Sequence, residues 1–143
     1  MSTKVIIMRG PSGSGKSTLA KQIHDDFDSL NKRIVSADTF MEEDGVYKFA
    51  PEKLAMCHQR CYHAYICMCA LAYSIKDKCL IIVDNTNIKR WEFAPYEQIA
   101  KKLDYELEYV IPPKPWDAKL FAGRNTHGVP LEKIEQMINN FES

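Results

Sequence analysis

The chain has 143 residues, 45% of them hydrophobic, which suits one domain with a real core and leaves little room for a second. Nineteen lysines and arginines balance nineteen aspartates and glutamates, so no global charge indicates a nucleic-acid or membrane-surface binder, although neutrality does not exclude a local basic groove. No signal-peptide stretch or run of about 18 apolar residues is present. We therefore expect one cytoplasmic domain over residues 1–143, without a membrane partner.

The first motif lies between an apolar run at residues 4–8 (KVIIM), which predicts a buried strand, and a helix predicted over residues 17–27. Residues 10–17 read GPSGSGKS, which matches the phosphate-binding pattern GxxxxGK[ST] in its strand-to-helix context. Its glycines let backbone amides point inward, and the helix start adds a positive dipole end. The residues expected to bind the nucleotide are Ser12, Gly13, Ser14, Gly15, Lys16, Ser17 and Thr18.

Within this loop, Lys16 would reach the β- and γ-phosphates, and the Ser17 hydroxyl would join the coordination shell of Mg²⁺. Thr18 would support the start of the helix. The same loop serves ATPases, GTPases and kinases, so it does not name the reaction. The sequence has no Asn-Lys-x-Asp guanine motif, which favours ATP as the nucleotide.

Residues 33–36 (RIVS) predict a second strand, and Asp38 follows at its carboxyl end, where ligands gather in open α/β sheets. A carboxylate there could take the proton of an acceptor hydroxyl, which makes Asp38 a candidate general base and substrate contact. The alternative is that Asp38 caps a short helix over residues 39–41. Residues 41–47 are polar and contain a glycine, so we expect a loop.

A long helix is predicted over residues 51–74, and it holds four of the five cysteines. Cys57 and Cys61 lie one turn apart with His58 and His63 close by, a pattern that suggests a metal site. One helix cannot easily surround a tetrahedral ion, however, and buried cysteines commonly fill helical cores. We therefore expect reduced thiols packed in the core rather than a zinc site.

Residues 79–83 (CLIIV) give the strongest strand signal and run into Asp84-Asn85-Thr86-Asn87, with a helix predicted over residues 91–103. An acid at the end of the most apolar strand is the usual Walker B position, which orients Mg²⁺ through water. Asn87 adds a neutral donor and acceptor beside it. The alternative is a plain turn, which Asp and Asn both favour.

Residues 105–111 alternate as a fourth strand, prolines follow, and helices are predicted over residues 116–124 and 131–141. Arg124 begins the sequence RNTHGVP near a helix end, where a guanidinium could close over a transferring phosphoryl group. An ordinary surface arginine is the alternative. We call residues 116–130 the lid segment.

Strands that alternate with helices imply right-handed crossovers and a parallel sheet covered on both faces. The predicted fold class is therefore α/β, a three-layer P-loop NTPase fold with a small, mostly parallel sheet flanked by helices and a helical lid.

The four motifs GPSGSGKS, VSADTF, IIVDNTN and RNTHGVP, in this order, resemble the polynucleotide kinase-like branch of P-loop kinases. This AAA-type group includes polynucleotide 5′-hydroxyl kinases and the kinase-like domain of cyclic nucleotide phosphodiesterase. The resemblance covers residues 6 to about 137. It implies that Lys16 and Ser17 contact phosphate and Mg²⁺, that Asp38 is the general base, and that Arg124 covers the phosphates. Asp84 and Asn87 would line the acceptor side.

Two positions depart from that family. Polynucleotide kinases often carry an arginine three residues after the base, where this chain has Met41, and a second lid arginine, where it has Leu120. Losing these cations weakens the grip on an acceptor phosphate, at about 1.5 to 3 kcal/mol for each charge-assisted contact. Other residues that could supply charge or stack a base are Lys48, Lys89, Arg90, Tyr47, Phe49 and Trp91.

The sequence thus favours an ATP- and Mg²⁺-dependent kinase that acts on a hydroxyl of a polynucleotide 5′ end or a related nucleotide. One alternative is a kinase for another hydroxyl acceptor, such as a hydroxylated DNA base, a nucleoside or a small molecule. Further alternatives are a non-catalytic ATP-binding adaptor module and a plain ATPase switch.

Overall fold

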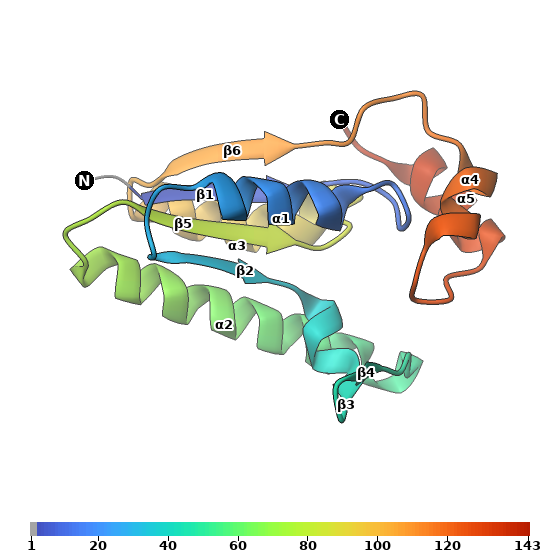
Figure 1. The fold of residues 1–143 in the computed structure, drawn as a ribbon, viewed down its shortest axis with the longest axis horizontal. Helices are drawn as coiled ribbons and strands as arrows, with labels where there is room; N and C mark the ends of the chain where they lie inside the picture. The colour runs from blue at the N-terminus through green and yellow to red at the C-terminus, as the bar shows by residue number, and fades with distance from the viewer. Residues whose placement is uncertain (1–2) are drawn as a thin grey trace.

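The centre of the structure is a parallel sheet. The computed structural model describes residues 3–143, in which the main sheet has the strand order β2-β5-β1-β6 with every pairing parallel (Figure 1). The inner strands β1 and β5 are buried along almost their whole length, because helices cover both faces of a parallel sheet, and this explains their unbroken apolar sequences. The strands are β1 (Thr3–Met8), β2 (Lys32–Val35), β5 (Cys79–Asp84) and β6 (Glu106–Val110).

Helices form the two outer layers, with α1 on one face of the sheet and α2 and α3 on the other (Figure 1). Successive side chains of a strand point to opposite faces, so Ile6 of β1 packs with Ala20 of α1, while Ile7 joins the cluster that contains Tyr65 of α2. The helices are α1 (Lys16–Asp26), α2 (Leu54–Ser74) and α3 (Arg90–Lys102). The predicted three-layer α/β fold is confirmed.

The lid segment and the following helix lie beyond the carboxyl ends of the strands (Figure 1). There α4 (Ala118–Arg124) packs against α5 (Leu131–Asn140). The predicted helix over residues 116–124 starts two residues late, because the Asp117 side chain caps α4 by accepting hydrogen bonds from the backbone of Lys119 and Leu120.

Residues 41–47, predicted as a loop, instead contain a small antiparallel hairpin. Its strands are β3 (Glu42–Glu43) and β4 (Val46–Tyr47). Asp44 and Gly45 have φ of 52° and 78°, the backbone of a two-residue hairpin turn that Asp-Gly favours. The loop prediction was wrong because strands of two residues are too short to show alternation.

Two short 3₁₀ helices complete the description, η1 (Ala37–Met41) after β2 and η2 (Pro51–Lys53) before α2. The predicted helix over residues 51–74 therefore begins as a 3₁₀ turn, with its proline at the first position, where a missing N–H costs nothing. Within residues 3–143, we find no helix with the length and apolar character that crossing a membrane requires.

Three of the four cysteines of α2 pack in the core as the sequence suggested, whereas Cys67 is exposed, so the expectation was wrong for that thiol. Cys57, Cys61 and Cys69 are at most 1% exposed, because spacings of four and eight residues place them on the helix face that meets the sheet. Burial raises the pKa of the Cys69 thiol to about 11 and also raises that of Cys61, so both are neutral. Among the described residues, no three His, Cys, Asp or Glu side chains gather as a metal site would require.

Candidate active site

The phosphate-binding loop follows β1 at the carboxyl edge of the sheet and leads into α1. Gly13 and Gly15 have φ of 80° and 89°, in the left-handed region that favours glycine. The Ser14 hydroxyl is buried with no hydrogen-bond partner among residues 3–143, while Ser17 and Thr18 are exposed in the first turn of α1. An unpaired hydroxyl beside the amino end of a helix fits the oxygens of a phosphate chain.

Lys16 and Asp84 meet beside this loop. The Lys16 Nζ lies 3.2 Å from Oδ1 of Asp84, and the two side chains are 10% and 8% exposed. The sheet brings them together, because Asp84 ends β5 opposite Met8 of β1, directly before the loop. A buried carboxylate beside a buried ammonium satisfies both charges, and the pair stands where a Walker acid and lysine are expected.

Asn85 and Asn87 take part in the fold around Asp84. Asn85 Oδ1 accepts a hydrogen bond from the Ala37 amide (2.9 Å), which ties the end of β5 to η1. Asn87 is 2% exposed, has φ of 47°, and its amide donates to the Met8 carbonyl (2.8 Å). Asparagine tolerates this backbone conformation, so the turn chemistry of the DNTN sequence contributes to the structure beside any role on the acceptor side.

Asp38 lies exposed in the first turn of η1, and it is not the helix cap that the sequence left as an alternative. The cap is Ser36, whose Oγ accepts a hydrogen bond from the Asp38 amide (3.2 Å). The Asp38 carboxylate instead faces His127 of the lid segment, with Oδ2 lying 3.3 Å from Nδ1. The His127 ring stacks on Tyr47, with ring centroids 3.9 Å apart.

Arg124 joins the lid segment to the phosphate-binding loop. Its Nη2 and Nε donate to the Gly13 carbonyl at 2.8 and 3.2 Å. α4 also packs closely on Gly13. A Cβ on Gly13 would lie only 2.2 Å from the Phe121 carbonyl oxygen. Arg124 is exposed but not simply solvated, and glycine at position 13 serves the docking of α4 as well as the turn.

The two family arginine positions differ in their surroundings. Met41 is 3% exposed and belongs to the core, so it presents nothing to a ligand, whereas Leu120 on α4 is 51% exposed. Glu43 of the hairpin pairs with both Lys48, directly after β4, and Lys53 of η2, at 3.7 and 3.1 Å. Neither family position therefore supplies a cation, and Lys48 and Lys53 share a single carboxylate.

Arg9, which sequence reasoning did not single out, anchors the chain end behind the site. It is 3% exposed, lies between the rings of Phe93 and Phe141, and donates to the carbonyls of Asn87, Ile88 and Glu142. Burial lowers its pKa, although three carbonyl acceptors and two rings still favour the cation. An arginine directly after a buried strand is a signal that could have marked it.

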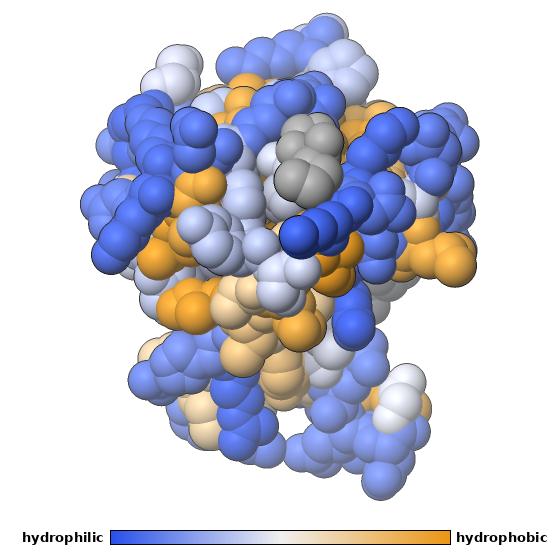
Figure 2. Space-filling view, turned by 90° about the vertical axis from the view of Figure 1, so that its left-hand side faces the viewer, coloured by the Kyte–Doolittle hydropathy of each residue, from blue (hydrophilic) through white to orange (hydrophobic). Residues whose placement is uncertain are grey.

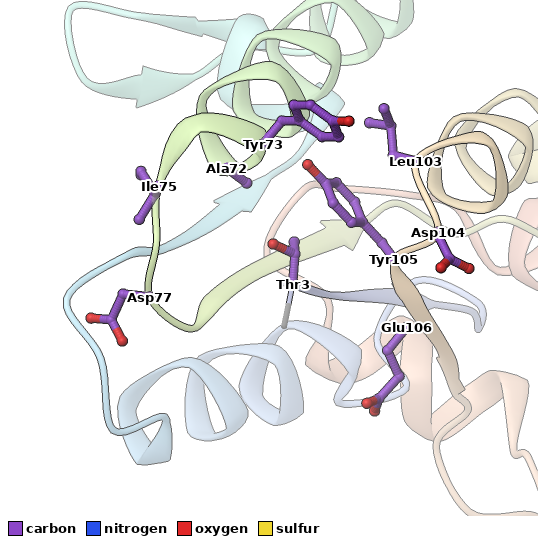
Figure 3. A pocket seen from close by; sticks show the side chains of 9 residues that line it. All are labelled: Thr3, Ala72, Tyr73, Ile75, Asp77, Leu103, Asp104, Tyr105 and Glu106. Atoms are coloured by element: carbon purple, nitrogen blue, oxygen red, sulfur yellow. The ribbon is translucent and has the colours of Figure 1, made fainter. Parts of the chain in front are cut away.

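A hollow of about 460 Å³ lies at the opposite end of the sheet, where the strands begin (Figure 3). On that side of the molecule, hydrophobic side chains show in small groups among hydrophilic ones (Figure 2). Its lining holds three carboxylates and no cation, which disfavours phosphate, so the size of the hollow does not make it the active site. The lining residues are Thr3, Ala72, Tyr73, Ile75, Asp77, Leu103, Asp104, Tyr105 and Glu106.

The chain is similar to a human protein and to a family model. Human NEDD4-binding protein 2 is 33% identical over 140 residues, which are 96% of this chain and 8% of the human protein's length. Residues 5–143 match a family model described as an AAA domain.

Solved structures share the fold. A chain of the Pnkp1/Rnl/Hen1 RNA repair complex superposes with a TM-score of 0.66 at 19% identity, over 97% of this chain and 44% of that one. The Mycobacterium tuberculosis APS kinase CysC, bound to AMPPNP and APS, gives a TM-score of 0.55 at 17% identity, over 80% and 64%. The chain therefore belongs to the AAA domain family, with the fold of P-loop kinases, and the resemblance to their polynucleotide kinase-like branch is confirmed.

Proposed function

We propose that this chain is an ATP-dependent phosphotransferase that moves the γ-phosphate of ATP to a hydroxyl group. One observation carries the proposal. The lid segment touches the phosphate-binding loop through Arg124 and, three residues later, touches Asp38 through His127. One short turn thus contacts both the phosphate-binding loop, through a cation that can stabilise phosphate charge, and Asp38, a carboxylate that can take a proton.

The residues would share the reaction as follows. When bound, ATP supplies the phosphoryl group and Mg²⁺ neutralises its charge; residues 12–18 would hold the nucleotide, with the metal on Ser17 and, through water, Asp84. Lys16 and Arg124 stabilise negative charge on the transferring group. Asp38 accepts the proton of the acceptor hydroxyl while the oxygen of that hydroxyl bonds to the γ-phosphorus. The bond from the γ-phosphorus to the bridging oxygen breaks, which leaves ADP.

As the acceptor we propose a polynucleotide 5′ end or a related nucleotide. The four motifs and the fold shared with a chain of an RNA repair complex support this choice. Asp84 and Asn87 would then contribute to the acceptor side. Asn87 would do so by holding the turn that follows Asp84, through its hydrogen bond to the Met8 carbonyl.

A second candidate is a kinase for a less charged hydroxyl acceptor, such as a hydroxylated base, a nucleoside or a small molecule. The buried Met41 favours it, because no arginine there can hold an acceptor phosphate. A third candidate is an ATP-binding adaptor module, which would bind the nucleotide without transferring its phosphoryl group.

Labelled ATP tests these candidates on a panel of 5′-hydroxyl oligonucleotides, nucleosides and duplexes that carry hydroxylated bases. We expect labelled product with at least one class, and Asp38→Asn should lower the rate by about 10²-fold or more while ATP still binds. Asp44→Asn, an exposed acid in the hairpin turn, is the matched control. Absence of product from the whole panel would favour the adaptor module, and product from nucleosides alone the second candidate.

A further inference from the structure

The ring of His127 contacts two groups that are distant in sequence. Its Nδ1 lies 3.3 Å from Oδ2 of Asp38, which comes from η1. Its face stacks on Tyr47 of β4, with 3.9 Å between centroids and 19° between planes. A parallel stack at this distance fixes the plane of the imidazole, and an imidazole with a fixed plane directs its nitrogen at the carboxylate.

Hydrogen bonds also hold the backbone of the turn that carries His127. The Asn125 Oδ1 accepts hydrogen bonds from the amides of His127 (3.2 Å) and Val129 (3.0 Å), and its amide donates to the Ala122 and Val129 carbonyls. Arg124, directly before, is bonded to the Gly13 carbonyl. The turn that docks Arg124 on the phosphate-binding loop therefore also sets the place of His127.

Tyr47 is suited to be a fixed platform. Burial, and then the nearby Asp38 carboxylate, raise the pKa of its hydroxyl, so the ring stays neutral and does not repel the acid. The hairpin that carries it is closed by the Asp44-Gly45 turn and by pairing of Lys53 with Glu43.

We propose that His127 is a positioning residue for phosphoryl transfer, a role that rests on the function proposed above. Held by Tyr47, it orients the Asp38 carboxylate so that one oxygen contacts the imidazole and the other takes the proton of the acceptor hydroxyl. Because Arg124 lies in the same turn, one segment sets both the contact with the phosphate-binding loop and the alignment of the base.

Kinetics with labelled ATP and a 5′-hydroxyl oligodeoxynucleotide, with adenosine as a second probe, test this role. His127→Ala and Tyr47→Leu should each lower kcat/KM for the acceptor about 10-fold or more through loss of alignment. The dissociation constant of ATP, measured by calorimetry, should not change. His127→Gln, which keeps a donor, and Tyr47→Phe, which keeps the ring, should restore most of the activity. His63→Ala, an exposed histidine of α2, is the control.

A second readout does not depend on catalysis. Stacking on Tyr47 places the His127 ring protons over an aromatic face, so their NMR resonances should lie upfield and move back in Tyr47→Leu, while those of His63 stay. Resonances that do not respond to Tyr47→Leu would overturn the contact itself. Unchanged acceptor kinetics in His127→Ala, beside an active wild type, would overturn the positioning role alone. A wild type that phosphorylates neither these probes nor the wider panel, with the upfield shift present, would overturn the proposed function and this role with it.

Discussion

The two halves of the candidate site are built differently. The nucleotide half is one continuous loop, residues 10–17, with two glycines at positive φ and a buried ion pair between Lys16 and Asp84. The proposed acceptor half is assembled from η1, the hairpin and the lid segment, and its side chains are more open, with Asp38 52% and His127 35% exposed.

The two halves depend on different features of the chain, local backbone shape in one and tertiary packing in the other. Phosphate binding depends on local backbone shape and a few buried charges, so many P-loop proteins share it. The proposed acceptor half rests on side chains that only the tertiary structure brings together, so it can change while the nucleotide half stays the same. The lid segment touches both halves, through Arg124 and His127.

The largest effect is expected from Lys16→Ala in the nucleotide half. Loss of the ammonium removes charge stabilisation at the phosphates, so kcat should fall by about 10² to 10³-fold. It also leaves the buried Asp84 carboxylate unpaired, which should lower the free energy of unfolding by about 3 kcal/mol or more. Steady-state kinetics and urea denaturation measure the two effects. Lys21→Ala, on the exposed face of α1, should change neither, and an equal loss there would contradict the assignment.

Arg9→Leu tests the support behind the site. It leaves carbonyls of Asn87, Ile88 and Glu142 without their donor, so we expect a loss of about 2 to 3 kcal/mol in the free energy of unfolding. Denaturant titration measures it. A loss confined to acceptor kinetics, with stability unchanged, would show that Arg9 does not anchor the chain end.

Gly13→Ala and Gly15→Ala form a matched pair that probes where the halves meet. Both place a side chain at positive φ, at about 1 kcal/mol each. A methyl at Gly15 meets nothing within 4 Å, whereas one at Gly13 would meet the Phe121 backbone at 2.2 Å. Gly13→Ala should therefore be the more destabilising and should also displace α4. Equal melting temperatures for the two variants would show that α4 does not dock on the loop.

The smallest effect is expected from Glu43→Gln in the acceptor half. It frees Lys48 and Lys53 from their carboxylate, so KM for an oligonucleotide should fall slightly and depend more steeply on salt, while KM for adenosine should not move. Glu42→Gln, which makes no ion pair within residues 3–143, is the control. An equal change with both probes would indicate that the hairpin does not meet acceptor phosphates.

Much of the nucleotide half was determined by the sequence alone, because it rests on local signals. The apolar runs, the GPSGSGKS spacing and the strand-end acid predicted a parallel sheet with Lys16 and Asp84 at its carboxyl edge, and the structure brings these two residues together. The hairpin turn was readable in principle from Asp44-Gly45, but its two-residue strands carry no periodicity.

Only the tertiary structure decided the acceptor half. No spacing rule connects Asp38, Tyr47 and His127, which meet because η1, the hairpin and the lid segment pack at one edge of the sheet. The burial of Met41 and the docking of Arg124 on the Gly13 carbonyl are likewise properties of packing. Local sequence limits backbone conformation and the kind of element that forms, whereas contacts between exposed side chains depend on how whole elements are placed.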